Sequence, residues 1–494
     1  MKRLHVGPML EGKQLTDAGG GTVDVINPAT GETVATQACC DPAAVERIVQ
    51  SSHNAFGSAA WQAMAPADRG RLLLKLADLF EADADNLVER ELLDTGKPIT
   101  QLRMGEIPLS AQLLRFYAGA ADKIEGAVKN TPGGLHITMY EPYGVVAGIL
   151  PWNYPLVNAV MKVAPALAAG NAIVLKPSVE TPLAAIPFVE LCTRAGIPDG
   201  IVNLVTGSGS QVGNALVANP NVKQISFTGS TAVGQSIQKL AADQMKMVNL
   251  ECGGKNAIIV FADADLDRAA DAVTISIFVN CGQLCVSCSR LLVEQSIADK
   301  FEKILLAKLA KVKVGDPRDE TTLVGPMITR SQYDLVLDYL DAAPKEGCKV
   351  LAGGGKLQLP PPLAGGLWIQ PTILTGVKPG MKVHDEEIFG PVLSIVRFAD
   401  EDEAVQIANA VEYGLSGSVW TANAERAARM VRTIDTGIIW VNTMLTGYPQ
   451  IPVSPHKMSG TGVEIGVEGL LAYCKRKSAV INADPSAPVG WSLK

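Results

Sequence analysis

The sequence lacks the features that would place this protein in a membrane, in a secretory pathway or on nucleic acid. No cluster of Lys and Arg exceeds the short run at 475–477 and the formal net charge is -7, so nucleic acid is not an expected partner. The most apolar stretch, 144–175, is broken by prolines, asparagines and a lysine, which argues against a membrane span. Residues 1–22 lack the apolar run of a signal peptide. We expect a cytoplasmic protein.

The sequence also has no fixed-period repeat and no low-complexity segment, and its number of cysteines is odd, so they cannot all pair within the chain. Its nine cysteines fit a reducing compartment better than a disulfide framework. The 494 residues are enough for two or three domains, and 47% hydrophobic with 19% charged residues is typical of a globular chain.

The middle of the chain alternates between apolar strands and helices. Because such strands are apolar throughout rather than on one face, they favour a parallel, doubly wound sheet. The expected strands are 144–150, 172–175, 202–205, 224–227 and 247–250. A second alternation follows Gly254, with strands at 258–261 and 291–293 and helices at 265–280 and 299–312. The sequence therefore predicts an α/β protein with two such sheets.

The flanking segments have other patterns. A short hairpin is expected within 23–38 and a helical region within 41–125, where Pro66 opens a long helix. Residues 136–140 predict a strand that belongs to neither sheet. The chain ends with a helical segment at 466–473, a strand at 477–481 and a polar tail.

Two glycine-rich loops follow strands of the first sheet, where doubly wound proteins bind ligands. The loop from Gly207 to Gly213 has one residue too many for a dinucleotide fingerprint, and the loop from Gly229 to Gly234 lacks the lysine of a phosphate loop. Each loop nevertheless precedes a helix, whose first amides are able to hold a pyrophosphate. Spacing alone does not decide whether these loops bind a coenzyme or are ordinary connections between a strand and a helix.

Cys285 and Glu251 are the candidate catalytic pair. Covalent catalysis on a carbonyl requires a thiol that attacks and a base that activates the water for release. Each residue alone has a structural alternative, a buried thiol or a surface carboxylate at a strand end. Cys281, Cys285 and Cys288 lack the second pair of ligands that a zinc site needs, so no metal is expected. Their spacing leaves open a reversible disulfide between Cys288 and an oxidised Cys285.

Six motifs in order give the chain from about 23 to 481 a resemblance to the aldehyde dehydrogenase superfamily. The motifs are Pro151-Trp-Asn-Tyr-Pro155, Lys176-Pro-Ser, Phe227-Thr-Gly-Ser-Thr231, Leu250-Glu-Cys-Gly-Gly-Lys255, Gly282-Gln-Leu-Cys285 and Glu387-Ile-Phe-Gly-Pro391. The resemblance implies two doubly wound, Rossmann-like domains and a small β element for oligomerisation. It implies a homodimer or a homotetramer.

The resemblance also implies the domain boundaries. Residues 1–123 and 142–253 would form the coenzyme-binding domain and 254–459 the catalytic domain. Residues 124–141 and 474–494 would form the oligomerisation element, and 460–473 would return the chain to the coenzyme domain.

By the same resemblance, Cys285 attacks an aldehyde carbon while Asn153 and the backbone N–H of Cys285 hold the oxyanion. Hydride then passes to NADP or NAD, which leaves a thioester, and Glu251 activates the water that releases the acid. Lys162 and Glu464 match positions of a proton relay, with a structural ion pair as the alternative. A relative that transfers the acyl group to coenzyme A is disfavoured, because such relatives usually lack the carboxylate at Glu251. A non-catalytic homologue is disfavoured because all the catalytic groups are present.

The resemblance assigns further residues to the two ligands. The coenzyme would contact Trp152, Lys176, Ser178, Val179, Gly207, Gly213, Phe227, Gly229, Ser230, Glu387 and Phe389. Val179 is the departure that matters, because relatives that prefer NAD usually carry a Glu there. The sequence has Glu180 one residue later, so we expect NADP to be used at least as well as NAD.

The implied substrate tunnel has one aromatic ring and no charged side chain. Its residues are Met104, Tyr154, Met161, Leu284, Val286 and Val453. This set offers neither an aromatic cage for a quaternary ammonium group nor an arginine for a carboxylate. We therefore expect neutral aliphatic or aromatic aldehydes as substrates. The alternatives are amino aldehydes, betaine aldehyde and semialdehydes.

Overall fold

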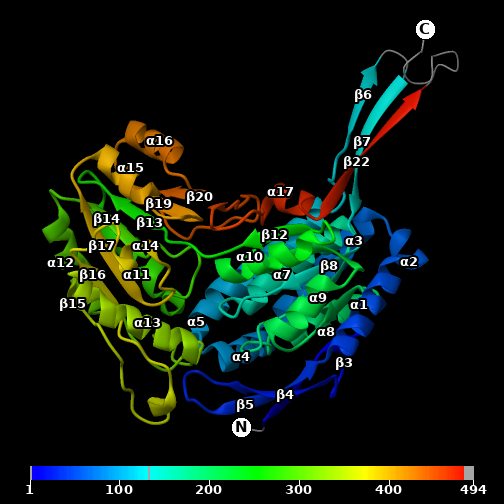
Figure 1. Cartoon of the computed structure of the whole chain (residues 1–494), viewed down its shortest axis with the longest axis horizontal. Helices are drawn as coiled ribbons and strands as arrows, with labels where there is room; N and C mark the ends of the chain where they lie inside the picture. The colour runs from blue at the N-terminus through cyan, green and yellow to red at the C-terminus, as the bar shows by residue number, and fades with distance from the viewer. Residues whose placement is uncertain (1–2, 132–133, 483–494) are drawn as a thin grey trace.

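The computed structural model describes residues 3–131 and 134–482, and two seven-stranded sheets dominate it (Figure 1). In the first sheet five adjacent strands run parallel. Its strands, in spatial order, are β12 (Met247–Glu251), β11 (Val222–Thr228), β8 (Val145–Ile149), β9 (Ala172–Lys176), β10 (Val202–Leu204), β2 (Met9–Leu10) and β3 (Lys13–Gln14). The last two are antiparallel additions at the edge.

In the second sheet, β15 at one edge is antiparallel and the other strands are parallel. Its strands, in spatial order, are β15 (Lys349–Ala352), β16 (Thr372–Thr375), β17 (Val392–Phe398), β14 (Arg290–Glu294), β13 (Ala257–Val260), β19 (Ser416–Trp420) and β20 (Ile438–Val441). The predicted α/β class with two parallel-dominated sheets is confirmed.

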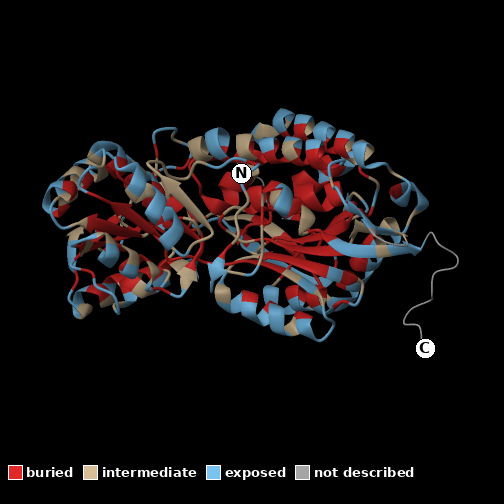
Figure 2. Cartoon of the chain, turned by 90° about the horizontal axis from the view of Figure 1, so that it is seen from above, coloured by how far each residue is buried: buried red, intermediate tan, exposed pale blue. Residues whose placement is uncertain are grey.

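The central strands are apolar throughout because helices cover both faces of each sheet. Every residue of β8, β9 and β13 is buried. Figure 2 shows these strands as a buried interior between helices with exposed outer faces. The first sheet has separate apolar cores on its two faces, and the second sheet has a core of its own.

The helical region within 41–125 is confirmed, and Asp41 caps its first helix by accepting a hydrogen bond from the backbone N–H of Ala44. One turn of it, Leu102–Glu106, is a π-helix. The helices around the first sheet are α1 (Pro42–Phe56), α2 (Ala59–Gln62), α3 (Pro66–Ala82), α4 (Ala84–Thr95), α5 (Ile99–Gln101), α6 (Ile107–Ala120), α7 (Pro155–Ala169), α8 (Ala185–Ala195), α9 (Asn214–Ala218), α10 (Thr231–Ala242) and α17 (Gly466–Leu471).

The helices around the second sheet include one whose predicted end is wrong. The predicted helix 265–280 stops at Phe278, because Asn280 and Cys281 adopt left-handed backbone angles that a right-handed helix excludes. The helices are α11 (Leu266–Phe278), α12 (Ala298–Leu309), α13 (Arg330–Ala342), α14 (Lys382–Asp385), α15 (Glu401–Asn409) and α16 (Ala424–Thr433). A short antiparallel pair, β18 (Tyr413–Gly414) and β21 (His456–Lys457), lies apart from the sheet.

Two smaller sheets complete the described chain. The predicted hairpin is formed by β4 (Gly19–Ile26) and β5 (Thr33–Cys40), and β1 (Leu4–Val6) adds to it. The predicted strands at 136–140 and 477–481 lie in β7 (Gly134–Pro142) and β22 (Cys474–Asn482), which pair with each other. The other side of β7 pairs with β6 (Ala127–Thr131).

This three-stranded sheet projects from the body of the molecule (Figure 1). The predicted tail at 483–494 lies outside the described residues. Among the residues that are described, no helix is long and apolar enough to cross a membrane.

Candidate active site

Two strands of the first sheet lead to candidate catalytic residues at the same edge of that sheet. β8 ends at Ile149, four residues before Asn153, and β12 ends at Glu251 itself. β11 runs between these two strands, and Lys162 reaches across to hydroxyl groups on it. Because the strands are parallel, their carboxyl ends meet at one edge.

Cys285 lies on a loop that begins with a left-handed turn. Asn280, Cys281 and Gly282 have φ angles of 50°, 56° and 71° in succession. At Gly282 a side chain is excluded as well, since a Cβ atom would lie 2.1 Å from the carbonyl oxygen of Gly390. This turn ends helix α11 and directs the chain toward the first sheet.

Asn256, at the start of β13, fixes the backbone around Cys285. Its side-chain N–H groups donate to the carbonyl oxygens of Cys285 at 2.7 Å and Ser287 at 2.9 Å. Its side-chain oxygen accepts from the backbone N–H of Ser416 at 2.9 Å. A buried amide with these three contacts holds the loop in one conformation.

Asn153 joins the loop after β8 to the loop that carries Cys285. Its Nδ2 donates to the backbone carbonyl oxygen of Gln283 at 2.9 Å. The backbone carbonyl oxygen of Asn153 accepts from Nδ2 of Asn280 at 3.1 Å. The contact to Gln283 uses one of the two N–H bonds of the amide, so the second is left for another acceptor. Asn153 is buried and lies beside the loop of Cys285, the place that an oxyanion donor would need.

The environment of Cys285 favours the neutral thiol. Burial is the largest cause that raises the pKa of Cys285 to about 12, and the carboxyl groups of Glu387 and Glu251 come next. A hydrogen bond from the backbone N–H of Val286 works in the opposite direction. The residue keeps partial exposure, unlike the buried Cys281 and Cys288 on either side.

Glu251 is buried, and its Oε1 has no hydrogen-bond partner among the described residues. Burial holds the pKa of this carboxyl well above its usual value, and the nearby Glu464 adds to the effect while Lys162 opposes it. A carboxyl group with a raised pKa is suited to accept a proton near neutral pH.

Lys162 and Glu464 form a buried ion pair behind Glu251. Nζ of Lys162 donates to Oε1 of Glu464 at 2.7 Å, to Oγ1 of Thr228 at 2.8 Å and to Oγ of Ser226 at 3.2 Å. Both side chains of the pair are almost fully buried. The structure thus shows the ion pair itself, which is compatible with a relay and with a structural role.

Eight of the eleven predicted coenzyme residues lie at or just after the ends of β9, β10 and β11. Lys176 is the last residue of β9, and its Cδ and Cε lie 3.6 Å from the position of a Cβ at Gly213. Burial lowers the pKa of Lys176 to about 8. A Cβ at Gly229 would lie 2.5 Å from the ring of Phe227, and Ser230 caps the start of α10. Gly207 has a φ of 133°, a conformation that side chains disfavour.

The loop after Lys176 carries the two residues that bear on coenzyme choice. Nε2 of Gln37 donates to the carbonyl oxygen of Val179 at 3.0 Å, which ties this loop to β5. The hydroxyl of Ser178 donates to the carboxylate of Glu180, which is exposed. The charge of Glu180 lies near enough to Lys176 to raise its pKa against the effect of burial.

Glu387, Phe389 and Trp152 gather where the two sheets face each other. Oε1 of Glu387 accepts from the backbone N–H of Gly254 at 2.8 Å, and burial raises its pKa to about 7. The rings of Trp152 and Phe389 meet edge to face, with centroids 5.3 Å apart. A carboxyl acceptor, a buried ammonium group, a capped helix start and two rings are the chemistry that a dinucleotide requires.

Comparison with known proteins decides the family. The aldehyde dehydrogenase family matches residues 15–479. The chain belongs to this family. An NAD-dependent aldehyde dehydrogenase from Sinorhizobium meliloti is 40% identical, with a TM-score of 0.95 over 99% of this chain and 96% of that one.

Two other solved structures of aldehyde dehydrogenases show how broad the likeness is. An indole-3-acetaldehyde dehydrogenase of P. syringae, in complex with NAD+ and IAA, is 40% identical, with a TM-score of 0.94 over 98% of this chain and 97% of that one. A betaine aldehyde dehydrogenase from Staphylococcus aureus, in complex with NAD+, is 35% identical, with a TM-score of 0.96 over the full length of both chains.

The predicted substrate residues of this aldehyde dehydrogenase come from several segments of the chain and differ in exposure. Leu284 and Val286 flank Cys285, and Val453 exchanges two backbone hydrogen bonds of 2.9 Å with Glu464. Tyr154 follows Asn153, and Nζ of the buried Lys97 lies 3.8 Å from the centroid of its ring. Met161 is partly buried on α7, whereas Met104 is 77% exposed on the π-helical turn. Their role in substrate binding stays a prediction.

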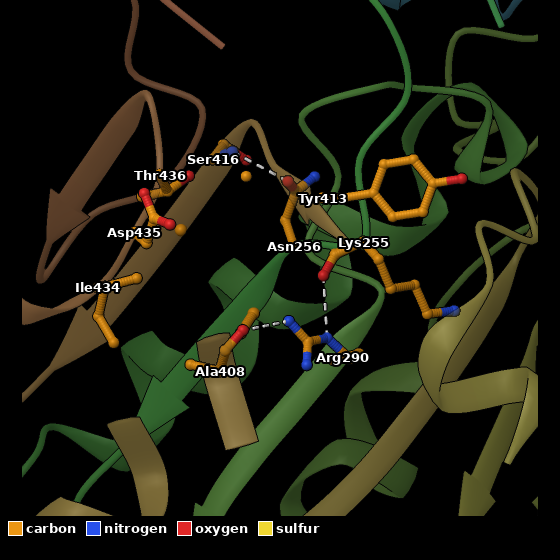
Figure 3. Close-up of a pocket in the computed structure, with 12 residues that line it drawn as sticks. Lys255, Asn256, Arg290, Ala408, Tyr413, Ser416, Ile434, Asp435 and Thr436 are labelled. Carbon is orange, nitrogen blue, oxygen red and sulfur yellow. Dashed lines mark hydrogen bonds between the residues drawn. The ribbon is translucent and has the colours of Figure 1, made fainter. Parts of the chain in front are cut away.

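A small pocket lies on the other side of Asn256. Figure 3 shows Lys255, Asn256 and Arg290 in its wall, with the bonds from Arg290 to the carbonyl oxygens of Lys255 and Ala408, both 2.9 Å. None of the six predicted substrate residues lines this pocket. It is therefore not the predicted tunnel.

Asn256 is the residue of this aldehyde dehydrogenase site that the sequence analysis missed. The signal was available, because an asparagine directly after Gly-Gly-Lys and before an apolar strand marks a buried polar position. What the sequence does not give is the partner, since Cys285 lies 29 residues further along the chain.

Proposed function

We propose that this enzyme oxidises a neutral aliphatic or aromatic aldehyde through a thiohemiacetal and a thioester on Cys285. One observation carries the assignment: the amide of Asn153, the thiol of Cys285 and the raised-pKa carboxyl of Glu251 converge where the first sheet meets the nucleophile loop. Three such groups from separate segments of the chain supply a nucleophile, an oxyanion donor and a base.

Each side chain then has a defined task. The Cys285 thiol first loses its proton to water, and the thiolate sulfur then bonds to the aldehyde carbon. The aldehyde oxygen that becomes negative accepts hydrogen bonds from Asn153 and from the backbone N–H of Cys285. A bound nicotinamide coenzyme supplies the hydride acceptor that converts the thiohemiacetal into a thioester. Glu251 takes a proton from water, the water oxygen adds to the thioester carbon, and the C–S bond breaks to release the acid and the thiolate.

Glu464 and Lys162 would carry the proton onward from Glu251. The support is electrostatic: the charge of Glu464 raises the pKa of Glu251, so the two buried carboxyl groups interact. Lys162 holds the Glu464 carboxylate by its shortest contact, at 2.7 Å.

The coenzyme would lie between the two sheets, on residues that fit it. Lys176 and Ser178 would contact the adenine ribose, with Val179, Gly207 and Gly213 beside them. Gly229, Ser230 and Phe227 would take the pyrophosphate, and Glu387, Phe389 and Trp152 the nicotinamide half. The support is Gly207 and Gly229, where a Cβ would lie 2.6 Å from Val212 and 2.5 Å from Phe227, together with the buried ammonium group of Lys176. We propose that the site accepts NADP at least as well as NAD.

The preference for neutral aldehydes rests on the surroundings of Tyr154. A quaternary ammonium group binds best in a cage of several aromatic rings, and Tyr154 is the one ring among the predicted tunnel residues. One face of that ring already carries the ammonium group of Lys97. The likeness to an indole-3-acetaldehyde dehydrogenase at 40% identity fits an apolar aldehyde, whereas the betaine aldehyde dehydrogenase is 35% identical.

The organisation of the chain follows the same proposal. Residues 1–123 and 142–253 would bind the coenzyme, and 254–459 would carry the nucleophile. Residues 460–473 would return the chain to the coenzyme-binding domain. The projecting sheet would join subunits into a dimer or a tetramer, since its outer strands expose Val128, Val480 and Ile481. The nine free cysteines fit the cytoplasm.

The test is coenzyme reduction by the purified protein with hexanal, benzaldehyde, betaine aldehyde and succinic semialdehyde, each with NAD and with NADP. The absorbance of the reduced coenzyme should rise with the first two aldehydes, and Cys285→Ala should abolish the rise. A kcat/KM for betaine aldehyde well above that for hexanal or benzaldehyde would show that the proposed substrate class is wrong.

A further inference from the structure

A buried chain of hydrogen bonds connects the ion pair behind Glu251 with the root of the projecting sheet. Nζ of Lys162 donates to Oγ of Ser226 at 3.2 Å, and the hydroxyl of Tyr473 donates to the same Oγ at 3.1 Å. Ser226 lies in the middle of β11, and Tyr473 is the residue before β22. Lys162 and Ser226 have no exposed surface, and Tyr473 is 1% exposed.

The ammonium group of Lys162 needs all three of its acceptors. It has three N–H bonds, and burial denies it water, so each bond must find a partner in the protein. Glu464, Thr228 and Ser226 are those partners. Because the three acceptors surround Nζ, the loss of Ser226 would free the ammonium group to move away from Glu464.

Tyr473 in turn fixes the hydroxyl of Ser226. A serine hydroxyl on a strand rotates between staggered positions unless a partner selects one. Tyr473 is well placed to select it, since its carbonyl accepts from Nδ2 of Asn171 at 2.9 Å and the preceding carbonyl, of Ala472, accepts from Nε2 of Gln224 at 2.8 Å. Burial, followed by the charge of Glu464, holds the pKa of the Tyr473 phenol well above its usual value, so the phenol remains a donor.

We propose that Ser226 and Tyr473 are positioning residues for release of the acyl group, in which Tyr473 holds Ser226 and Ser226 holds Lys162 against Glu464. The inference rests on the proposed function, because it assigns Lys162 and Glu464 to the proton path from Glu251. Neither Ser226 nor Tyr473 touches the reacting atoms. Their effect should therefore fall on thioester hydrolysis and leave the formation of the thioester intact.

The experiment compares the pre-steady-state burst of reduced coenzyme with steady-state turnover in Ser226→Ala, Tyr473→Phe and the double variant. Ser226→Ala should lower steady-state turnover about tenfold, since it removes a hydrogen bond to a charged group, and should leave the burst amplitude and the KM for coenzyme unchanged. Tyr473→Phe should lower turnover about threefold. The double variant should match Ser226→Ala alone, because Tyr473 acts only through that hydroxyl.

Two further variants separate positioning from general damage. Ser226→Thr restores a hydroxyl and should recover most of the turnover. Tyr333→Phe removes only the hydroxyl group of a buried tyrosine of α13, in the core of the second sheet, and should leave turnover unchanged.

The inference is overturned if the effects of Ser226→Ala and Tyr473→Phe multiply in the double variant, if the burst falls together with the steady-state rate, or if turnover does not change. A wild-type protein that gives neither burst nor turnover with any aldehyde would refute the proposed function instead.

Discussion

Replacing Val179 by glutamate should shift the coenzyme preference of this enzyme toward NAD and away from NADP. Val179 is half-buried, and its carbonyl oxygen is held by Gln37, so a new side chain at this position would leave the backbone in place. A carboxylate here would face the adenine ribose beside Lys176. It would accept hydrogen bonds from the two ribose hydroxyls of NAD and would repel the 2′-phosphate of NADP.

The size of the change follows from the exposure of the site. Two unit charges about 4 Å apart interact by about 1 kcal/mol in bulk water and about 4 kcal/mol at an effective dielectric constant of 20. A half-buried loop lies between these limits, so a repulsion of about 2 kcal/mol should lower kcat/KM for NADP about thirtyfold. Each hydrogen bond gained by NAD should contribute about 0.5–1.5 kcal/mol.

The assay is kcat/KM for both coenzymes, measured with one aldehyde, for the wild type, Val179→Glu and Glu180→Gln. The wild type should use NADP at least as well as NAD, and Val179→Glu should lower NADP use selectively. Glu180→Gln is the control, because the carboxylate of Glu180 contacts Ser178 and its charge acts on Lys176. A wild type that prefers NAD a hundredfold, and loses this preference in Glu180→Gln, would refute the reasoning from Val179.

Three further predictions concern the catalytic groups and Lys176. Glu251→Gln should keep the burst of reduced coenzyme and lower the steady-state rate about a hundredfold or more, and a variant without burst or bound acyl group would contradict the role of Glu251. Asn153→Ala should lower the burst rate constant about 10²–10³-fold, and an unchanged burst would exclude it as the oxyanion donor. The ratio of kcat/KM for NADP to that for NAD should fall as pH rises through about 8, where the Lys176 ammonium that attracts the 2′-phosphate loses its proton. A ratio that stays constant from pH 7 to 9 would argue against this contact.

The parallel sheets were predictable because their strands carry their signal locally. Ile173 and Val174 on β9 are buried on opposite faces, so an unbroken apolar run was enough to place that strand. The edge strands β2 and β3 were not predictable, because two residues each carry no periodicity. They exist because Met9 pairs with Leu204, almost two hundred residues later, and no local pattern encodes that contact.

The candidate site divides in the same way. Cys285 and Glu251 were singled out as catalytic candidates from residue type and from their places at a cysteine-rich loop and a strand end. The left-handed backbone of Asn280 and Cys281 was not predicted, since residues other than glycine rarely adopt that conformation, and cysteine is not among those enriched in it. The contacts of Asn256 with Cys285 and of Tyr473 with Ser226 join positions far apart in sequence, and only the fold brings them together.

The raised pKa of Cys285 has a consequence that alkylation would reveal. Below its pKa of about 12 the thiol ionises tenfold more with each unit of pH, and only the thiolate attacks iodoacetamide. The rate of inactivation of the coenzyme-free enzyme should therefore rise steadily between pH 7 and 10 and reach no plateau. Glu387→Gln should raise the rate at pH 9, because the charge of Glu387 is the second cause of the raised pKa after burial.

Assigning the modified sulfur makes the result specific to this site. Eight of the nine cysteines are buried and Cys285 alone is partly exposed, so mass spectrometry should find Cys285 alkylated first. A plateau near pH 8.5 would mean that a positive charge or a donor acts on the thiolate more strongly than Glu387, Glu251 and burial together. The nucleophile would then be ionised before the coenzyme binds, and the description of Cys285 as a neutral thiol in the free enzyme would be wrong.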